Sequence, residues 1–482
     1  MKPSVLDQFL ALLGDTGVIS APEQLSTYEC DGLTNFRMVP DAVLLPTTTQ
    51  QVQGVVGICR REKIPFVARG SGTGLSGGAL PVKNGVVISL ARMNRILEVD
   101  YVNQRAVVEP GVINSNVTLQ VSPRGFFYAP DPSSQQVCSI GGNVAENSGG
   151  AHCLKYGFTT THVLGLEVVL PDASIVHLGS RVVDAPGYDL PGIFVGSEGT
   201  LGIATKIILR IVKRPEVIQT LLAAFNSTNE AGAAVSEVIK AGMLPAAIEM
   251  MDNLAIQAAE AAVHASYPDC GGLLLVELDG PAAEVATLMQ DVSRICTNCG
   301  AWEIRVAQSQ AERDVVWKGR KAAFAAVGRI SPNYIVQDGV VPRTALPEVM
   351  SEIERMSQQY GLRCANVFHA GDGNLHPLVL YDRKIAGQES RAEEFSGEIL
   401  HRCIRVGGSI TGEHGVGEEK KMYMGEMFAE PDLDTMLLVR CAFDPENLSN
   451  PGKVFPRTRL CAEKTGPYEP HPLEVAGVAQ FF

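Results

Sequence analysis

Hydrophobic residues up to about Arg214 occur in short runs that are separated by glycine, proline and other turn residues. Such runs, rich in valine and isoleucine, are typical of β-strands. The predicted strands are DAVLLP, IPFVAR, GVVISL, RAVVEPG, HVLGLEVVLP and GIATKIILRIV. One clear helix is predicted in this part of the chain, at Thr49–Glu62, because its apolar residues repeat at helical spacing.

From Gln219 the pattern changes to an alternation of strands and helices. The strands TLLAAF, AAIEMM, GLLLVELDG and AWEIRVA alternate with the helices EAGAAVSEVIKAG, LAIQAAEAAVHA and AAEVATLMQDVSRI. This order predicts a smaller α/β domain with its helices on one face of a sheet. The fold class is therefore α+β, and we expect domains at residues 1–215 and 216–456, followed by a tail at residues 457–482.

The amino-acid composition limits the kinds of partner and the cell compartment that we expect for this protein. The formal net charge is -13, and no cluster of Lys and Arg with interleaved aromatic residues offsets it, so nucleic acid is excluded as a partner. The 11 cysteines are irregularly spaced, which favours reduced thiols in the cytoplasm. No apolar run approaches the roughly 18 residues of a membrane span, so we expect contact with the inner membrane only through partner subunits.

The densest glycine segment is Arg69–Ala79, RGSGTGLSGGA, directly after a predicted strand. Consecutive glycines let backbone N–H groups converge on one point, as a pyrophosphate requires. A Rossmann loop would open a helix, whereas here the next strand begins within about ten residues, so NAD is disfavoured. The alternative interpretation of this loop alone is a tight surface turn.

Three further segments favour a ligand over a turn. Asp131–Ser134, Ser139–Gly150 and Gly196–Ile203 are rich in small residues, and each adjoins a predicted strand. Together with the first loop they would line a long, flat ligand that carries a polyphosphate.

These motifs, RGSGTGLSGGAL, APDPSSQQVCSIGGNVAENSGGAHCLKYG and GSEGTLGI, resemble the FAD-binding domain of the vanillyl-alcohol oxidase and p-cresol methylhydroxylase (PCMH) superfamily. Within it the chain is similar to the FAD-linked D subunits of bacterial glycolate oxidase, with D-lactate and D-2-hydroxyglutarate dehydrogenases as more distant relatives. The resemblance implies a PCMH-type FAD-binding domain, a smaller substrate (cap) domain and a C-terminal segment that returns to the flavin.

The resemblance also implies which residues bind FAD. They are Gly70, Ser71, Gly72, Thr73, Gly74, Leu75, Ser76, Gly77, Gly78, Asp131, Pro132, Ser133, Ser134, Ser139, Gly142, Asn143, Gly196, Glu198, Gly199, Gly202, Ile203 and Asn450. Some members of the superfamily attach flavin covalently through His or Cys. Because Arg69–Ala79 contains neither residue type, we expect non-covalent FAD.

A second constellation combines VFHAGDGNLH with GSITGEHGVG. The AGDGN turn predicts a hairpin that brings His369 and His376 together across its neck. With Glu413 they would form a zinc site that has an open position, although a lone histidine is more often a core residue. A 2-His-1-carboxylate iron oxygenase uses the same ligand types but leaves the glycine loops unexplained. The resemblance implies a divalent metal such as Zn²⁺, His414 as general base, and substrate contact by Asn374.

A basic trio, Lys318, Arg320 and Lys321, lies on a helix predicted at residues 312–328. Such a trio is by default a solvated helix face, but an arginine that faces a pocket would grip a carboxylate with its planar fork. The resemblance implies that Arg320 is this carboxylate anchor. It also implies that Phe324, one turn later, favours a short substrate.

The implied reaction is removal of a hydride from C2 of a small 2-hydroxy acid to FAD, with glycolate favoured and glyoxylate as product. By resemblance the chain works with a second flavin-domain-like subunit and an iron–sulfur subunit that pass electrons to quinone. The alternatives are D-lactate or D-2-hydroxyglutarate as substrate, and a non-redox nucleotide-binding module. One methyl group in the substrate changes the discrimination free energy by only about 1–3 kcal/mol, so no single residue in the sequence separates glycolate from D-lactate.

Overall fold

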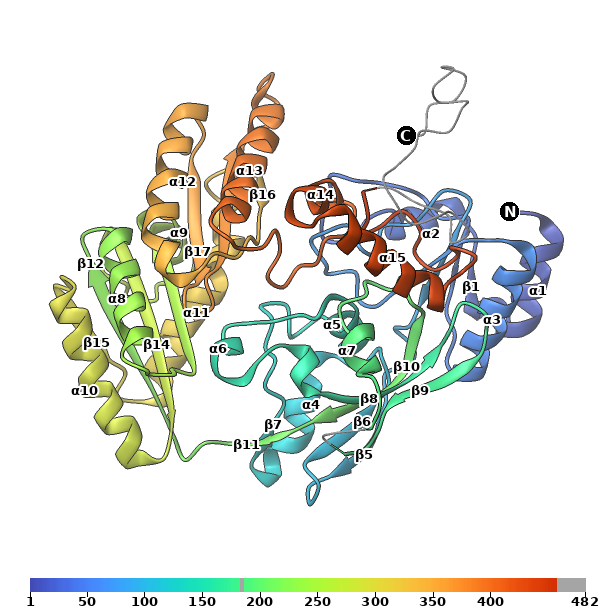
Figure 1. The fold of residues 1–482 in the computed structure, drawn as a ribbon, viewed down its shortest axis with the longest axis horizontal. Helices are drawn as coiled ribbons and strands as arrows, with labels where there is room; N and C mark the ends of the chain where they lie inside the picture. Colours follow the sequence, from blue (N-terminus) through green and yellow to red (C-terminus); the bar gives the residue numbers. More distant parts are fainter. Residues whose placement is uncertain (183–185, 457–482) are drawn as a thin grey trace.

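The computed structural model describes residues 1–182 and 186–456, which form two units and a C-terminal return (Figure 1). The tail expected at residues 457–482 lies outside the described residues. In Figure 1 the first unit, in blue and teal, lies beside the second unit, in green to orange, and the last helices lie over the first unit.

The first unit contains a four-stranded sheet in the order β1-β2-β4-β3, an antiparallel five-stranded sheet in the order β5-β6-β10-β8-β9, and the pair β11-β7. The strands are β1 (Val18–Ile19), β2 (Ala42–Leu44), β3 (Phe66–Arg69), β4 (Val86–Ser89), β5 (Ile96–Asp100), β6 (Arg105–Val108), β7 (Phe126–Phe127), β8 (Val163–Val169), β9 (Ile175–Gly179), β10 (Ile203–Arg210) and β11 (Val212–Lys213). The helices are α1 (Pro3–Leu13), α2 (Pro22–Leu25), α3 (Thr49–Glu62), α4 (Asn114–Val121), α5 (Ile140–Glu146), α6 (Cys153–Tyr156) and α7 (Leu190–Phe194). The six predicted strands and the helix at Thr49–Glu62 are confirmed.

Local chemistry fixes the ends of α3. The Thr48 side chain accepts a hydrogen bond from the backbone N–H of Gln51, which satisfies one of the free donors of the first turn. The helix ends where Lys63 adopts a left-handed conformation with φ 54°. Its buried valines pack against the four-stranded sheet, and this holds the strand that precedes the glycine loop.

The second unit is built on an antiparallel seven-stranded sheet in the order β15-β12-β14-β13-β17-β18-β16. Its strands are β12 (Val217–Phe225), β13 (Ala247–Asp252), β14 (Gly272–Gly280), β15 (Glu303–Val306), β16 (Asn333–Val336), β17 (Cys364–His369) and β18 (Asn374–Tyr381). Its helices are α8 (Thr228–Lys240), α9 (Asn253–Val263), α10 (Ala282–Asn298), α11 (Gln310–Val327), α12 (Leu346–Tyr360) and α13 (Gln388–Arg405).

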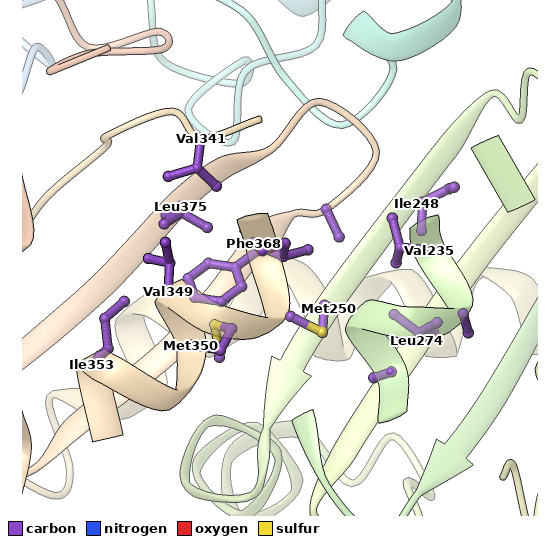
Figure 2. Close-up of a cluster of buried hydrophobic side chains, with 14 of the residues drawn as sticks. Val235, Ile248, Met250, Leu274, Val341, Val349, Met350, Ile353, Phe368 and Leu375 are labelled. Carbon is purple, nitrogen blue, oxygen red and sulfur yellow. The ribbon is translucent and has the colours of Figure 1, made fainter. Parts of the chain in front are cut away.

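Helices cover both faces of this sheet, so the prediction of helices on one face is wrong. Leu221 and Ala223 of β12 belong to one core together with residues of α8, α10, α12 and α13. Leu222 and Ala224 of the same strand pack with α9 and α11 on the other side. Figure 2 shows part of the first core, where Met250 and Phe368 of the sheet meet Met350 of α12. The continuous apolar run of β14 is the sequence mark of a sheet that is buried on both faces.

After α13 the chain crosses back to the first unit through α14 (Met424–Met427) and α15 (Glu430–Phe443). The segment beyond α15 then runs beside β3, because Phe66 N donates to Leu448 O at 2.9 Å and Asn450 N donates to Phe66 O at 2.8 Å. The chain therefore has the C-terminal return that was expected. Within residues 1–182 and 186–456 we found no helix with the length and apolarity that a membrane crossing needs.

Candidate active site

A cavity of about 600 Å³ lies where the two units meet. From the first unit it is lined by the glycine loop and by parts of the other small-residue segments. From the later part of the chain it is lined by Phe324, β16, Tyr381, Arg383, Glu413 and His414. The four small-residue segments, Glu413 and His414 thus face one shared space.

Most of the residues expected to bind FAD line this cavity. They are Gly70, Ser71, Gly72, Thr73, Gly74, Leu75, Gly78, Pro132, Ser133, Ser134, Ser139, Gly142, Asn143, Glu198, Gly199, Gly202 and Ile203. The others are not part of the lining: Ser76, Gly77, Asp131, Gly196 and Asn450. Asn450 connects two lining segments, since its side-chain amide donates to Gly78 O at 2.8 Å and Glu198 O at 2.7 Å.

The glycine loop leaves its backbone donors free. The N–H groups of residues 70–78 donate no hydrogen bond to any described residue. A Cβ atom at Gly70 would lie 2.3 Å from Ser139 Oγ, so this position requires glycine for the loop to approach α5. Unpartnered N–H groups that face a cavity are the donors that a phosphate-bearing ligand needs.

His369 and His376 come together across the predicted hairpin, and this prediction is confirmed. Their rings lie 5.1 Å apart, on β17 and β18, whose register pairs His369 with Asn374. Glu413 Oε1 lies 3.3 Å from His369 Nε2 and 3.0 Å from His376 Nε2. The ligand atoms of these three residues lie within 4.8 Å of one another, so the three could hold a metal ion.

Glu249, which the sequence reasoning missed, stands behind this cluster. It lies on β13, beside His369 in the sheet register, and its side chain is almost fully buried. Its Oε1 lies 2.8 Å from His369 Nδ1. A carboxylate in this position fixes the ring so that Nε2 points at the ligand site, as a supporting carboxylate does in metal sites.

His414 is held through its backbone. Asp338 Oδ2 accepts hydrogen bonds from the N–H groups of Gly412, Glu413 and His414 at 2.7 to 3.0 Å, and Lys420 pairs with the other carboxylate oxygen. Burial raises the pKa of Asp338, but Lys420 and nearby histidines outweigh it and bring this pKa to about 2. Burial lowers the pKa of His414 to about 4, so its ring is neutral at pH 7.

Arg320 and Asn374 are both buried near His369, which pairs with Asn374 in the sheet and shares Glu249 with Arg320. Arg320 Nη2 lies 2.5 Å from Glu249 Oε2, and its Nε and Nη2 make no hydrogen bond to a described residue. Asn374 Oδ1 also lacks such a partner. Phe324 lines the cavity and packs edge-on against His376 at 5.6 Å, whereas Arg320 does not line the cavity.

Other buried charged groups near the cavity were not anticipated. Asp338 follows β16 in VQDGVV, where a lone charge in a largely apolar segment is its only sequence signal. Lys420 lies among other charged residues in GEEKK and has no sequence signal that sets it apart. Glu146 closes α5 between the glycine loop and Gly415. Burial and the charge of Glu198 raise the pKa of Glu146 well above its ordinary value.

The chain matches two family models. Residues 40–179 match the FAD binding domain, and residues 214–454 match the C-terminal domain of FAD linked oxidases. These matches show the flavin cofactor that the resemblance implied.

Curated relatives match along nearly the whole chain. The glycolate oxidase subunit GlcD of Escherichia coli is 50% identical over 92% of this chain and 90% of that protein. GlcD of Bacillus subtilis is 38% identical over 92% of this chain and 97% of that protein. A D-lactate dehydrogenase of Anaerostipes hadrus is 31% identical over 86% of this chain and 89% of that protein.

Among solved structures, p-cresol methylhydroxylase with substrate bound superposes with a TM-score of 0.78 over 94% of this chain and 96% of that chain, at 20% identity. At this identity the match shows the fold alone. It confirms the expected PCMH-type architecture.

Proposed function

Because the chain belongs to the FAD-linked oxidases, in the family of the GlcD subunits of glycolate oxidase, we propose that it oxidises glycolate to glyoxylate with FAD. One observation carries the proposal. His414 and Glu413 line the same cavity as the flavin-binding loops, so an acid held beside His414 would also meet the cofactor.

FAD fits the residues that are present. The free N–H groups of residues 70–78 suit a pyrophosphate, and the other lining segments extend the cavity away from that loop. The buried Asn143 Nδ2 has no hydrogen-bond partner among the described residues, which adds a donor for the ligand. When bound, the flavin supplies the acceptor for a hydride from substrate carbon.

A divalent cation such as Zn²⁺ fits His369, His376 and Glu413. Their chemistry is an established zinc ligand set, and Glu413 Oε2 has no hydrogen-bond partner among the described residues. Such an ion would act as a Lewis acid toward the substrate hydroxyl. The three residues themselves bring two imidazoles and one carboxylate to a single point beside the cavity.

Three residues of the chain would transfer the hydroxyl proton and bind the substrate. His414, which is neutral at pH 7 and whose Nδ1 has no hydrogen-bond partner among the described residues, accepts the proton of the substrate hydroxyl. Arg320 anchors the substrate carboxylate with its buried Nε, which has no hydrogen-bond partner among the described residues, while its Nη2 pairs with Glu249. Asn374 contacts the substrate through its free Oδ1.

A short acid fits the site best. Phe324 fills the space beside His376, so a substrate with a long side chain would have to displace an aromatic ring. D-lactate is the second candidate, because a D-lactate dehydrogenase is among the relatives. We propose residues 1–215 as the flavin domain and 216–456 as the cap domain together with the C-terminal segment that closes over the flavin.

The remaining proposals concern partners and location. E. coli GlcD is described as a subunit, and by analogy we propose a second flavin-domain-like subunit and an iron–sulfur subunit as partners. We place the protein in the cytoplasm, where these partners would bring it to the inner membrane.

The test is a comparison of kcat/KM for glycolate, D-lactate, L-lactate and D-2-hydroxyglutarate with a dye as electron acceptor. Glycolate should give the highest value and D-lactate the next. The Phe324→Ala variant should improve turnover of the larger acids relative to glycolate. A preference for D-2-hydroxyglutarate in the wild-type protein would contradict the proposed substrate.

A further inference from the structure

His152 lies between the two units, just before α6, and its ring reaches a carboxylate on each side. Its Nδ1 lies 2.8 Å from Asp131 Oδ2 in the first unit. Its Nε2 lies 3.0 Å from Glu277 Oε1 on β14 of the second unit. Because ionised carboxylates only accept hydrogen bonds, the ring satisfies both contacts when both nitrogens are protonated, as an imidazolium.

In the second unit, Glu277 is the centre of a buried hydrogen-bond network. Its Oε2 accepts hydrogen bonds from Thr220 Oγ1 at 2.8 Å, Arg313 Nε at 2.9 Å and Trp317 Nε1 at 2.6 Å. The Trp317 ring also stacks on His152, with ring centroids 5.5 Å apart. Arg313 and Trp317 belong to α11, the helix that carries Arg320 and Phe324.

In the first unit, the contact between His152 and Asp131 lies next to the loop that lines the cavity. The backbone N–H of His152 donates to Asp131 Oδ1 at 3.3 Å, so main chain and side chain of His152 hold the same carboxylate. A Cβ atom at Gly150 would lie 2.5 Å from the Asp131 carbonyl, which shows how closely the two turns pack. The next residues after Asp131, Pro132 to Ser134, line the cavity.

We propose that His152 is a positioning residue that couples the second unit to the flavin-binding loop 131–134, by bridging Asp131 and Glu277. The bridge aligns α11, and with it Arg320 and Phe324, against the loop that faces the cofactor. The proposal rests on FAD as the cofactor and not on the identity of the substrate.

A neighbouring contact joins the same two units without reaching this loop, and it supplies a matched control. Asp279, two residues after Glu277 on β14, pairs with Lys155 and accepts a hydrogen bond from Tyr156 Oη at 2.5 Å. Loss of either carboxylate removes a buried contact between the units, but only Glu277 connects to Asp131 through His152.

The experiment measures the FAD dissociation constant of the Glu277→Gln and Asp279→Asn variants by flavin fluorescence. Glu277→Gln should weaken FAD binding by about fivefold or more, although Glu277 does not line the cavity. Asp279→Asn should lower thermal stability and leave FAD affinity unchanged. Unchanged FAD affinity in folded Glu277→Gln would overturn the proposal, and so would an equal loss in Asp279→Asn.

Variants of His152 test the bridge itself. His152→Gln should weaken FAD as Glu277→Gln does, and the double variant should be no weaker than either single one, because both remove the same coupling. His152→Arg retains a cation with donors for both carboxylates and should restore part of the affinity. Additive losses in the double variant would refute the bridge.

The coupling can also be tested from the side of the flavin-binding loop, by changing Asp131 and measuring the effect on α11. This measurement does not use the Glu277 or His152 variants. Since coupling between sites is reciprocal, Asp131→Asn should increase hydrogen exchange in α11. Unchanged exchange in α11 would refute the coupling. If no acid reduces the flavin while Glu277→Gln still weakens FAD binding, the proposed function fails and the coupling stands.

Discussion

Asp338 Oδ2 accepts a hydrogen bond from the backbone N–H of His414 at 2.7 Å, and it holds the two preceding N–H groups as well. The turn that carries Glu413 and His414 is therefore fixed by a carboxylate from the second unit, some 75 residues earlier in the chain. A turn held in this way presents its side chains to the cavity before any substrate arrives, which is the preorganisation that a catalytic base requires.

Separation of the Asp338–Lys420 pair should destabilise the fold strongly. Both side chains are fully buried, so Lys420→Met leaves an uncompensated carboxylate and should lower the free energy of unfolding by about 3–5 kcal/mol. Denaturant unfolding gives this value. The double variant Asp338→Asn/Lys420→Met should be more stable than Lys420→Met alone; equal or lower stability would show that the two charges do not compensate each other.

Removal of the metal site should abolish bound metal without loss of FAD. Elemental analysis of the wild-type protein should give about one divalent ion per chain, and His376→Ala should give none, because three protein ligands are the minimum for such a site. His401→Ala is the control, since His401 pairs with Glu426 outside the cavity. Wild-type protein that stays metal-free after incubation with Zn²⁺ would refute the site.

Gly415→Ala should disturb the turn after His414. Gly415 has φ 84°, and an added Cβ would lie 2.2 Å from Glu146 Oε2 and 2.9 Å from Glu198 Oε1. Strain of this kind costs about 1–3 kcal/mol, so the melting temperature and the rate of flavin reduction should both fall. Gly425→Ala, where no atom lies within 4 Å of the added Cβ, should leave both unchanged. Equal behaviour of the two variants would contradict this packing.

The stability provided by His152 should depend on pH. Burial lowers the pKa of His152, but Asp131 and Glu277 outweigh it and raise this pKa from 6.5 to about 10. Between pH 6.5 and pH 10 His152 is deprotonated in the unfolded chain but protonated in the folded protein. The stabilisation of the fold by protonated His152 is therefore complete below pH 6.5 and is lost as the pH rises toward 10. Arg313, which faces Glu277, stays charged over this range.

The measurement is the difference in melting temperature between wild type and His152→Gln at several pH values. This difference should be largest near pH 6 and should shrink toward pH 10. A difference that is constant or grows with pH would show that His152 is not an imidazolium in the folded protein.

Local patterns in the sequence predicted much of the site. The turn residues of AGDGN specified the hairpin, and this spacing was enough to bring His369 and His376 together. The consecutive glycines of the loop favoured phosphate binding, and the strand that follows soon after it disfavoured a Rossmann helix, which is absent from this part of the described chain. Such features depend on residues that are close in the chain.

Contacts between distant charged residues could not be predicted in this way. Glu249 and His369 meet through the sheet order β13-β17, which no local pattern specifies. The spacing of α11 likewise gave no sign that Arg320 pairs with Glu249, while Lys318 is exposed on the same helix. The Glu249–His369 and Arg320–Glu249 contacts both result from tertiary packing. The Glu249 carboxylate can be buried because its charged partners lie on other elements of the fold.

The most direct test of the central claim, that His414 and the flavin share one cavity, is anaerobic titration of the purified protein with glycolate. The visible absorbance of the flavin should bleach as glycolate is added. His414→Ala should retain FAD and bleach about 100- to 10,000-fold more slowly. Equally fast bleaching in His414→Ala, or flavin that none of the 2-hydroxy acids reduces, would contradict the account.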